Sequence, residues 1–255
     1  MSLPYYQVSH SRAQRSRIRV LLNDVPICSG KASGRTTSQE VINELIGPGD
    51  NVFLFEIAEA EWAKDAFNLA LWRDGAPEHR LVDFTWGAES PPVDRAGKLP
   101  QVFSASFFVD DVTHVPCFRR AAPAEFGCDG LPQQIDLVMR MQQMVELKRA
   151  DLWPDLMKLQ HSELYAANHQ NPGDHPSTRR DSLVELFSME IRTRPLAASE
   201  LHFERRAEGR VALVTRLDGS APVTAVSEGV DADGFMMQLA PDLRMTRLDG
   251  RWQLF

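Results

Sequence analysis

The chain has 255 residues, of which 43% are apolar and 25% are charged, a balance typical of globular proteins. Its 28 basic and 35 acidic residues give a net charge of −7, which argues against a nucleic-acid partner and against binding to an anionic membrane. Three cysteines without a C-x-x-C spacing, no apolar run of membrane-spanning length and no signal-peptide layout together predict a soluble, cytoplasmic protein.

Short strands are predicted throughout the amino-terminal half, where runs of β-branched and aromatic residues alternate with turn residues. These strands are expected at residues 5–8, 17–22, 25–27, 41–46, 52–57, 67–72, 81–86, 102–109 and 114–118. Asn23 and Asp24 predict a hairpin between two of them, and Pro26 places its strand at a sheet edge. Short strands at this spacing are typical of an antiparallel β-sandwich, which we assign to residues 1–125.

A helical pattern follows residues 121–132, which are rich in alanine, proline and glycine and mark the predicted domain boundary. The apolar residues of the first helix lie about one turn apart, at Ile135, Val138, Met141 and Val145. A second helix is expected to begin near Leu152, and a third after Ser177, ending at Pro195.

Six strands are predicted after the helices, at residues 200–205, 211–217, 223–229, 235–239, 243–248 and 251–255. Asp-Gly pairs at 218–219, 233–234 and 249–250 separate them, and glycine supplies the positive φ of tight hairpins. The pattern predicts an antiparallel meander in a second domain, residues 131–255. The expected fold class is therefore α+β, an antiparallel β-sandwich followed by helices and a curved, cone-like antiparallel sheet.

The closing residues 247–255, RLDGRWQLF, resemble the last hairpin of the nuclear-transport-factor-2-like, or ketosteroid-isomerase-like, superfamily, where D-G-x-W often precedes the final strand. Residues 147–153, LKRADLW, are similar to the break between the first two helices of that superfamily, although its first strand is not evident here. The resemblance implies a cone whose pocket can hold a catalytic Asp, His or Tyr. It also implies a homodimer through the exposed face of the sheet.

In the amino-terminal half, residues 45–54, LIGPGDNVFL, resemble a turn of jelly-roll and immunoglobulin-like sandwiches, including accessory domains of carbohydrate-active enzymes. This resemblance bears on the fold, because fold does not determine function. Trp62, which is flanked by charged residues, is the tryptophan expected to be exposed and is the candidate sugar-stacking platform. The alternative is a core position, as expected for Trp72 and Trp86 within strand patterns.

One helical stripe carries side chains that are able to transfer protons. His161, Tyr165 and His169 are spaced by four and share a helix face, where imidazole and phenol groups can exchange protons near neutral pH. The alternative is a polar face turned to solvent. The helical acids Asp136, Glu185 and Glu190 are either pocket residues or surface charges. No ligand set favours a metal, and no cofactor is expected.

Function is the least determined property. The G-x-G-x-x-G, P-loop, H-E-x-x-H, G-x-S-x-G and EF-hand patterns are all absent from the sequence. The leading hypothesis is a two-domain, non-enzymatic binding or interaction protein, whose partner is an unidentified small molecule or protein. Two alternatives stay open. One is a small-molecule isomerase, dehydratase or hydrolase with a pocket in the carboxy-terminal cone, and the other is a carbohydrate-binding module.

Overall fold

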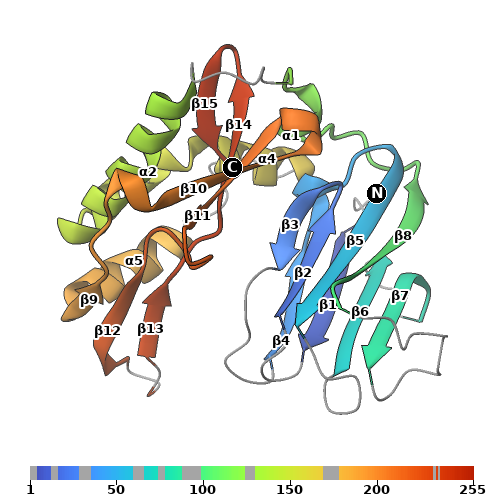
Figure 1. Ribbon diagram of the computed structural model, residues 1–255, viewed down its shortest axis with the longest axis horizontal. Coiled ribbons are helices and arrows are strands. Elements are labelled where there is room, and N and C mark those ends of the chain that lie inside the picture. Colours follow the sequence, from blue (N-terminus) through green and yellow to red (C-terminus); the bar gives the residue numbers. More distant parts are fainter. Residues whose placement is uncertain are drawn as a thin grey trace. The chain divides into compact units, whose positions relative to one another are not determined.

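The structure, a computed structural model, describes residues 5–12, 17–28, 36–59, 66–73, 78–87, 99–123, 130–168, 178–231, 234 and 236–255. It is a mixed α and β fold, and each described strand pairing is antiparallel. The chain divides into two compact units, with Cys117 as the first residue of the second and Ala167 and Asn168 counted with the first (Figure 1). The predicted boundary between residues 125 and 131 stays a prediction.

The first unit consists of two four-stranded sheets, with strand orders β4-β1-β6-β7 and β3-β2-β5-β8. Its strands are β1 (Tyr6–Arg12), β2 (Arg17–Leu22), β3 (Val25–Cys28), β4 (Thr36–Val41), β5 (Gly49–Glu59), β6 (Ala66–Arg73), β7 (Arg80–Gly87) and β8 (Gln101–Val109). Most of the predicted strands are present. The strand predicted at 41–46 is wrong, because β4 ends at Val41 and Asn43–Leu45 form a 3-10 turn.

The β2–β3 hairpin turns at Asn23 and Asp24 as predicted, since their φ angles of 52° and 65° are those of a type I′ turn. The Asn23 side chain also donates to the carbonyl of Leu45 (2.9 Å) and accepts from the amide of Val52 (3.1 Å). This asparagine therefore joins its own hairpin to the turn that leads into β5.

Asn51 organises the Gly47–Asn51 turn from inside. Its side chain is fully buried, donates to the carbonyls of Gly47 and Gly49 at 2.9 Å, and accepts from the Gly47 amide at 3.1 Å. Gly49 has a φ of 87°, which glycine adopts without strain. The P-G-x-N stretch is thus explained as a turn closed by its own asparagine.

Aromatic side chains fill the space between the two sheets of the first unit. Phe55 of β5 stacks on Phe84 of β7 with ring centroids 4.0 Å apart, and Phe53 lies 5.6 Å from Phe107 of β8. Trp86 is buried, as predicted, and its indole N–H donates to the Gln101 side chain at 3.2 Å. The strand predicted at 114–118 is wrong, because the chain there leads instead into a short helix.

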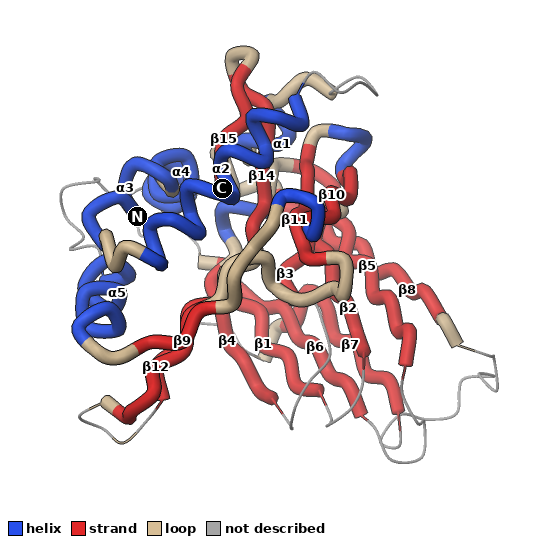
Figure 2. Tube along the Cα trace, turned by 60° about the vertical axis from the view of Figure 1, so that its left-hand side comes forward, coloured by secondary structure: helices blue, strands red, loops and turns tan. Residues whose placement is uncertain are grey.

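The second unit begins with helices and ends with strands. Its helices are α1 (Cys117–Arg120), α2 (Leu131–Glu146), α3 (Trp153–Leu156), α4 (Lys158–Ala167) and α5 (Thr178–Ser188), with 3-10 turns at Ala150–Leu152, Ala198–Glu200 and Ala207–Gly209. Figure 2 shows the helices in blue. The first predicted helix, α2, is confirmed. The second is interrupted at Met157, where ψ is 20°. None of the described helices is both long and apolar enough to cross a membrane.

In the described part of this unit, seven strands form two sheets. They are β9 (Ile191–Thr193), β10 (Leu201–Arg206), β11 (Val211–Arg216), β12 (Ala225–Val230), β13 (Met236–Leu239), β14 (Leu243–Leu248) and β15 (Arg251–Leu254). The sheet orders are β10-β11-β14-β15 and β13-β12-β9. Helix α5 ends at Ser188, so the expectation that the third helix runs to Pro195 is wrong and β9 takes its place.

The predicted meander is also wrong in its connectivity, because β11 pairs with β14 rather than with β12. The connections on either side of β12 and β13 contain Pro222 and Pro241, which lack the N–H that a continuing ladder needs. β12 pairs instead with β9 and β13. The β14–β15 hairpin turns at Asp249 and Gly250 as predicted, with φ angles of 50° and 76°.

Between α2 and the larger sheet lies an apolar core. Val138, Met141 and Met144 of α2 have no exposed surface, and they belong to one buried cluster with Met245 and Trp252 of the last hairpin. The methionines at 141 and 144 are therefore core residues. The interior of this unit, in its described part, is made mainly of hydrocarbon side chains.

Candidate functional site

The predicted proton-transfer stripe lies on α4. Its described members, His161 and Tyr165, are both half-buried, whereas the buried face of the helix is formed by Leu159, Glu163 and Ala167. His169 lies outside the described residues. Burial lowers the pKa of His161 below its ordinary value, so this imidazole is neutral at physiological pH. The stripe therefore flanks the packed side of the helix.

This pKa shift predicts a pH dependence. As pH falls below about 6.5, the unfolded chain binds a proton at His161 that the folded chain resists, so the free energy of unfolding decreases. The variant His161→Gln lacks this titrating group and should not show that part of the decrease. Its free energy of unfolding, relative to that of wild type, should therefore increase as the pH falls from about 7 to about 5. Urea unfolding across this range measures the difference. Parallel curves for the two proteins would contradict it.

The buried ionisable group of α4 is Glu163, which the sequence did not single out as a site. Its side chain is 4% exposed. One carboxylate oxygen accepts the backbone N–H of Cys117 at 2.8 Å, and the other is paired with the Arg120 guanidinium. The signal available in the sequence was its spacing of four from Leu159 and Ala167, which puts a carboxylate on the packed face of the helix.

The Cys117 thiol, whose own backbone N–H binds this carboxylate, is buried and not disulfide-bonded. Burial, and next the charge of Glu163, raise the pKa of the thiol far above its ordinary value. The sulfur therefore stays protonated and is a poor nucleophile. The adjacent Phe118 ring stacks on Phe255 with centroids 6.1 Å apart, so the cluster fastens α1 to α4 and to the end of the chain.

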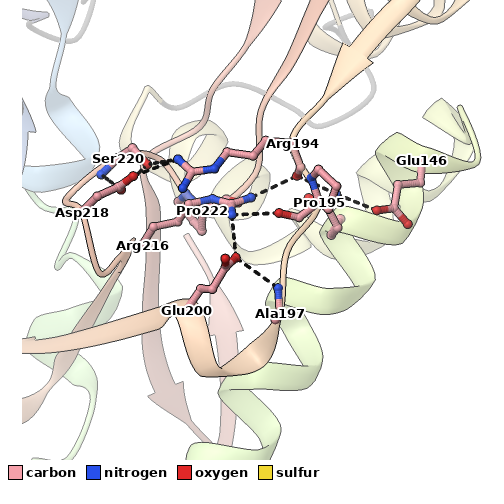
Figure 3. Close-up of polar contacts among 10 residues, drawn as sticks. Glu146, Arg194, Pro195, Ala197, Glu200, Arg216, Asp218, Ser220 and Pro222 are labelled. Carbon is pink, nitrogen blue, oxygen red and sulfur yellow. Dashed lines mark hydrogen bonds and ion pairs between the residues drawn. The ribbon is translucent and has the colours of Figure 1, made fainter.

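Arg216, at the end of β11, is a second buried charge (Figure 3). Its side chain is 1% exposed, and its guanidinium donates to the carbonyls of Arg194 (3.0 Å), Pro195 (2.8 Å) and Pro222 (3.1 Å). It also pairs with the Glu200 carboxylate at 2.8 Å. Four acceptors around one cation hold the β9–β10 connection against the β11–β12 connection.

The outer part of this network is exposed to solvent. Arg194 pairs with Asp218 at 2.9 Å, and Ser220 donates its amide and its hydroxyl to the same carboxylate. The Ser220 hydrogen bonds, and then the Arg194 hydrogen bond, hold the pKa of Asp218 well below its usual range. The bonds around Arg216 connect protein groups to one another, so the network stabilises two loops.

The remaining candidates are three helical acids and one tryptophan. Asp136, Glu185 and Glu190 are exposed, as surface charges are. Trp62 lies outside the described residues. Among the residues that the structure describes, no three His, Cys, Asp or Glu side chains gather in a way that would hold a metal ion.

Strand β8 presents a different kind of site, an exposed edge. It is the last strand of its sheet, and no described strand pairs with its other side. Its side chains alternate, and Val102 and Phe108 on the outward face are 60% and 64% exposed. Ser104 and Ser106 lie between them on the same face. The strand has no charged residue, no proline and no glycine.

Two of the other three edges of the same unit carry residues that discourage strand pairing, and the third has a charged residue in its sequence. β3 contains Pro26, β4 contains Glu40 in its sequence, and β7 carries the exposed Arg80–Asp83 ion pair at 2.8 Å. Natural sheets protect their edges with such residues, because an unprotected edge recruits another strand. β8 is therefore the unprotected edge of the described sheets in this unit.

Comparisons of the chain with protein-family models, with curated proteins and with solved structures find no match. The structure agrees with the predictions at a coarse level, since the first unit is rich in β-strands and the second contains helices and sheets. The resemblances of the two halves to known superfamilies remain predictions.

Proposed function

We propose that this protein is a non-enzymatic interaction protein that binds a partner by strand pairing at the edge of β8. The unprotected β8 edge, with Val102 and Phe108 exposed on it, carries the proposal. A strand added to this edge gains main-chain hydrogen bonds from β8, and its side chains on one face meet the outward residues of β8. Affinity comes from the backbone, and selectivity comes from Val102 and Phe108.

The buried charges support a binding role over a catalytic one. Glu163 and Arg216 are both bonded to groups of the protein itself, and burial keeps the Cys117 thiol protonated. A general acid–base enzyme needs an ionisable group that faces its substrate in a pocket. The described core of the second unit is instead apolar.

A short extended peptide tests this function. The probe is a peptide of alternating valine and threonine with lysines at both ends, titrated into the dilute full-length protein while amide NMR spectra are recorded. Saturable shifts confined to β8 and the neighbouring β5 are expected, with weak affinity of about 100 µM because the contact is small. The same peptide with a central proline should bind far less, since proline cannot donate to the ladder.

A protein variant supplies the matched control. The double variant Ser104→Lys/Ser106→Lys changes two exposed outward positions of β8 and should abolish the shifts, as edge lysines do in natural sheets. Leu217→Lys, at a 70% exposed position elsewhere, should leave them unchanged. Shifts that spread over the second unit, or no shifts at all, would refute strand binding at β8.

A further inference from the structure

The sequence of β8 is nearly symmetric about its central residue. On either side of Ala105 stand Ser104 and Ser106, then Phe103 and Phe107, and then the apolar pair Val102 and Phe108. Because outward and inward residues alternate, each symmetric pair lies on one face of the sheet. A strand with this symmetry is complementary to itself when it runs antiparallel.

We infer that the partner of the β8 edge is the β8 edge of a second copy of this chain, paired antiparallel about Ala105. In this register, Ser104 lies opposite Ser106 of the second copy and Val102 lies opposite its Phe108, each twice because of the two-fold axis. Hydroxyl pairs and pairs of an aromatic with a β-branched residue are both favourable across antiparallel strands. The β3-β2-β5-β8 sheet of one copy and the same sheet of the second copy then form one continuous sheet.

The identity of the occupant rests on two features of β8. The strand is uncharged, so no like charges face each other within the paired strands, although each chain carries a net charge of −7. Its exposed apolar residues, Val102 and Phe108, are the two that meet across the two-fold axis in the symmetric register. Binding of an unrelated strand would not require the sequence of β8 to be symmetric about Ala105, whereas pairing with a second copy does. This inference rests on the proposed strand-binding function and narrows it to one partner.

Charge changes at the two serines test the register, with the full-length protein analysed by sedimentation velocity over a range of micromolar concentrations. Wild type should form a dimer that dissociates on dilution. Ser104→Lys/Ser106→Lys places lysine opposite lysine and should be monomeric. Ser104→Lys/Ser106→Glu places lysine opposite glutamate at both symmetric positions and should restore the dimer. All of these changes lie at exposed positions, so the fold is retained.

Cross-linking then fixes the alignment. A mixture of Ser104→Cys and Ser106→Cys chains should form an intermolecular disulfide faster than either variant alone, because only the mixed pair stands directly opposite. The wild type supplies the background from the native cysteines.

Three results would overturn the inference: a wild type that stays monomeric, a dimer that survives Ser104→Lys/Ser106→Lys, or equal cross-linking of mixed and single variants. The peptide titration separates the two proposals. Shifts at β8 in a protein that never dimerises leave strand binding standing and remove self-association, whereas the absence of both removes both.

Discussion

Replacing Arg216 by methionine is expected to destabilise the second unit by about 3–5 kcal/mol. The substitution keeps the buried hydrocarbon stem but removes the guanidinium donors of Pro195, Pro222 and Glu200. The carbonyl of Pro222 is bonded in a buried position and those of Arg194 and Pro195 in part-buried ones, and a fully buried carbonyl left without a donor costs about 1–3 kcal/mol. The guanidinium also joins the β9–β10 and β11–β12 connections from the buried side, so its loss leaves the exposed Arg194–Asp218 pair to link them.

Arg194 offers a matched control for this change in the same network. Its side chain is 51% exposed, and its ion pair with Asp218 lies in solvent, where such pairs add little to stability. Arg194→Met should therefore have little effect. Urea unfolding, followed by hydrogen exchange of peptides from β11 and β14, isolates the second unit from the first. Equal losses for the two variants would contradict the role assigned to burial.

The sequence correctly predicted turns and helices that are determined by residues close together in the chain. The type I′ turn at Asn23 and Asp24 and the turn at Asp249 and Gly250 follow from residues that tolerate positive φ. Helix α2 follows from its apolar stripe. The α+β composition follows from adding such elements together, so the coarse fold was accessible from the sequence.

Pairings between distant segments were not accessible in the same way. β11 pairs with β14 across two intervening strands, and no residue in either strand encodes that choice by itself. The break at Met157 lies within a run that has good helical periodicity, so propensity alone favoured one long helix. Tertiary packing decided both cases.

The buried charges show why sites were harder to predict than elements. Three of the acceptors of Arg216 are backbone carbonyls. Every residue has a backbone carbonyl, so the sequence does not show which of them bind a side chain. Glu163 was passed over in favour of His161 and Tyr165, because the chemistry of a side chain is visible in a sequence and its burial is not. The edge of β8 is the reverse case. Its residues predict an ordinary strand. Only the sheet order shows that the edge of β8 that faces away from β5 has no described partner strand.

Replacing Glu163 by leucine is expected to destabilise α1 and its attachment to α4 by about 2–3 kcal/mol. Leucine fits a buried helix position, but it leaves the N–H of Cys117 without its acceptor and Arg120 without its counter-charge. The expected loss lies below that of Arg216→Met, because Glu163 has two partners whereas Arg216 donates to four acceptors.

The buried thiol reports this loss directly. Loosening of α1 exposes Cys117, so alkylation of this residue under native conditions, mapped by mass spectrometry, should be at least tenfold faster in Glu163→Leu than in wild type. Glu163→Gln retains an oxygen for the Cys117 amide and should show an intermediate rate. Glu185→Leu, an exposed position on α5, should match wild type. A thiol that stays equally protected in Glu163→Leu would mean that the stacking of Phe118 on Phe255 holds α1 without the carboxylate, and the electrostatic account of this cluster would fail.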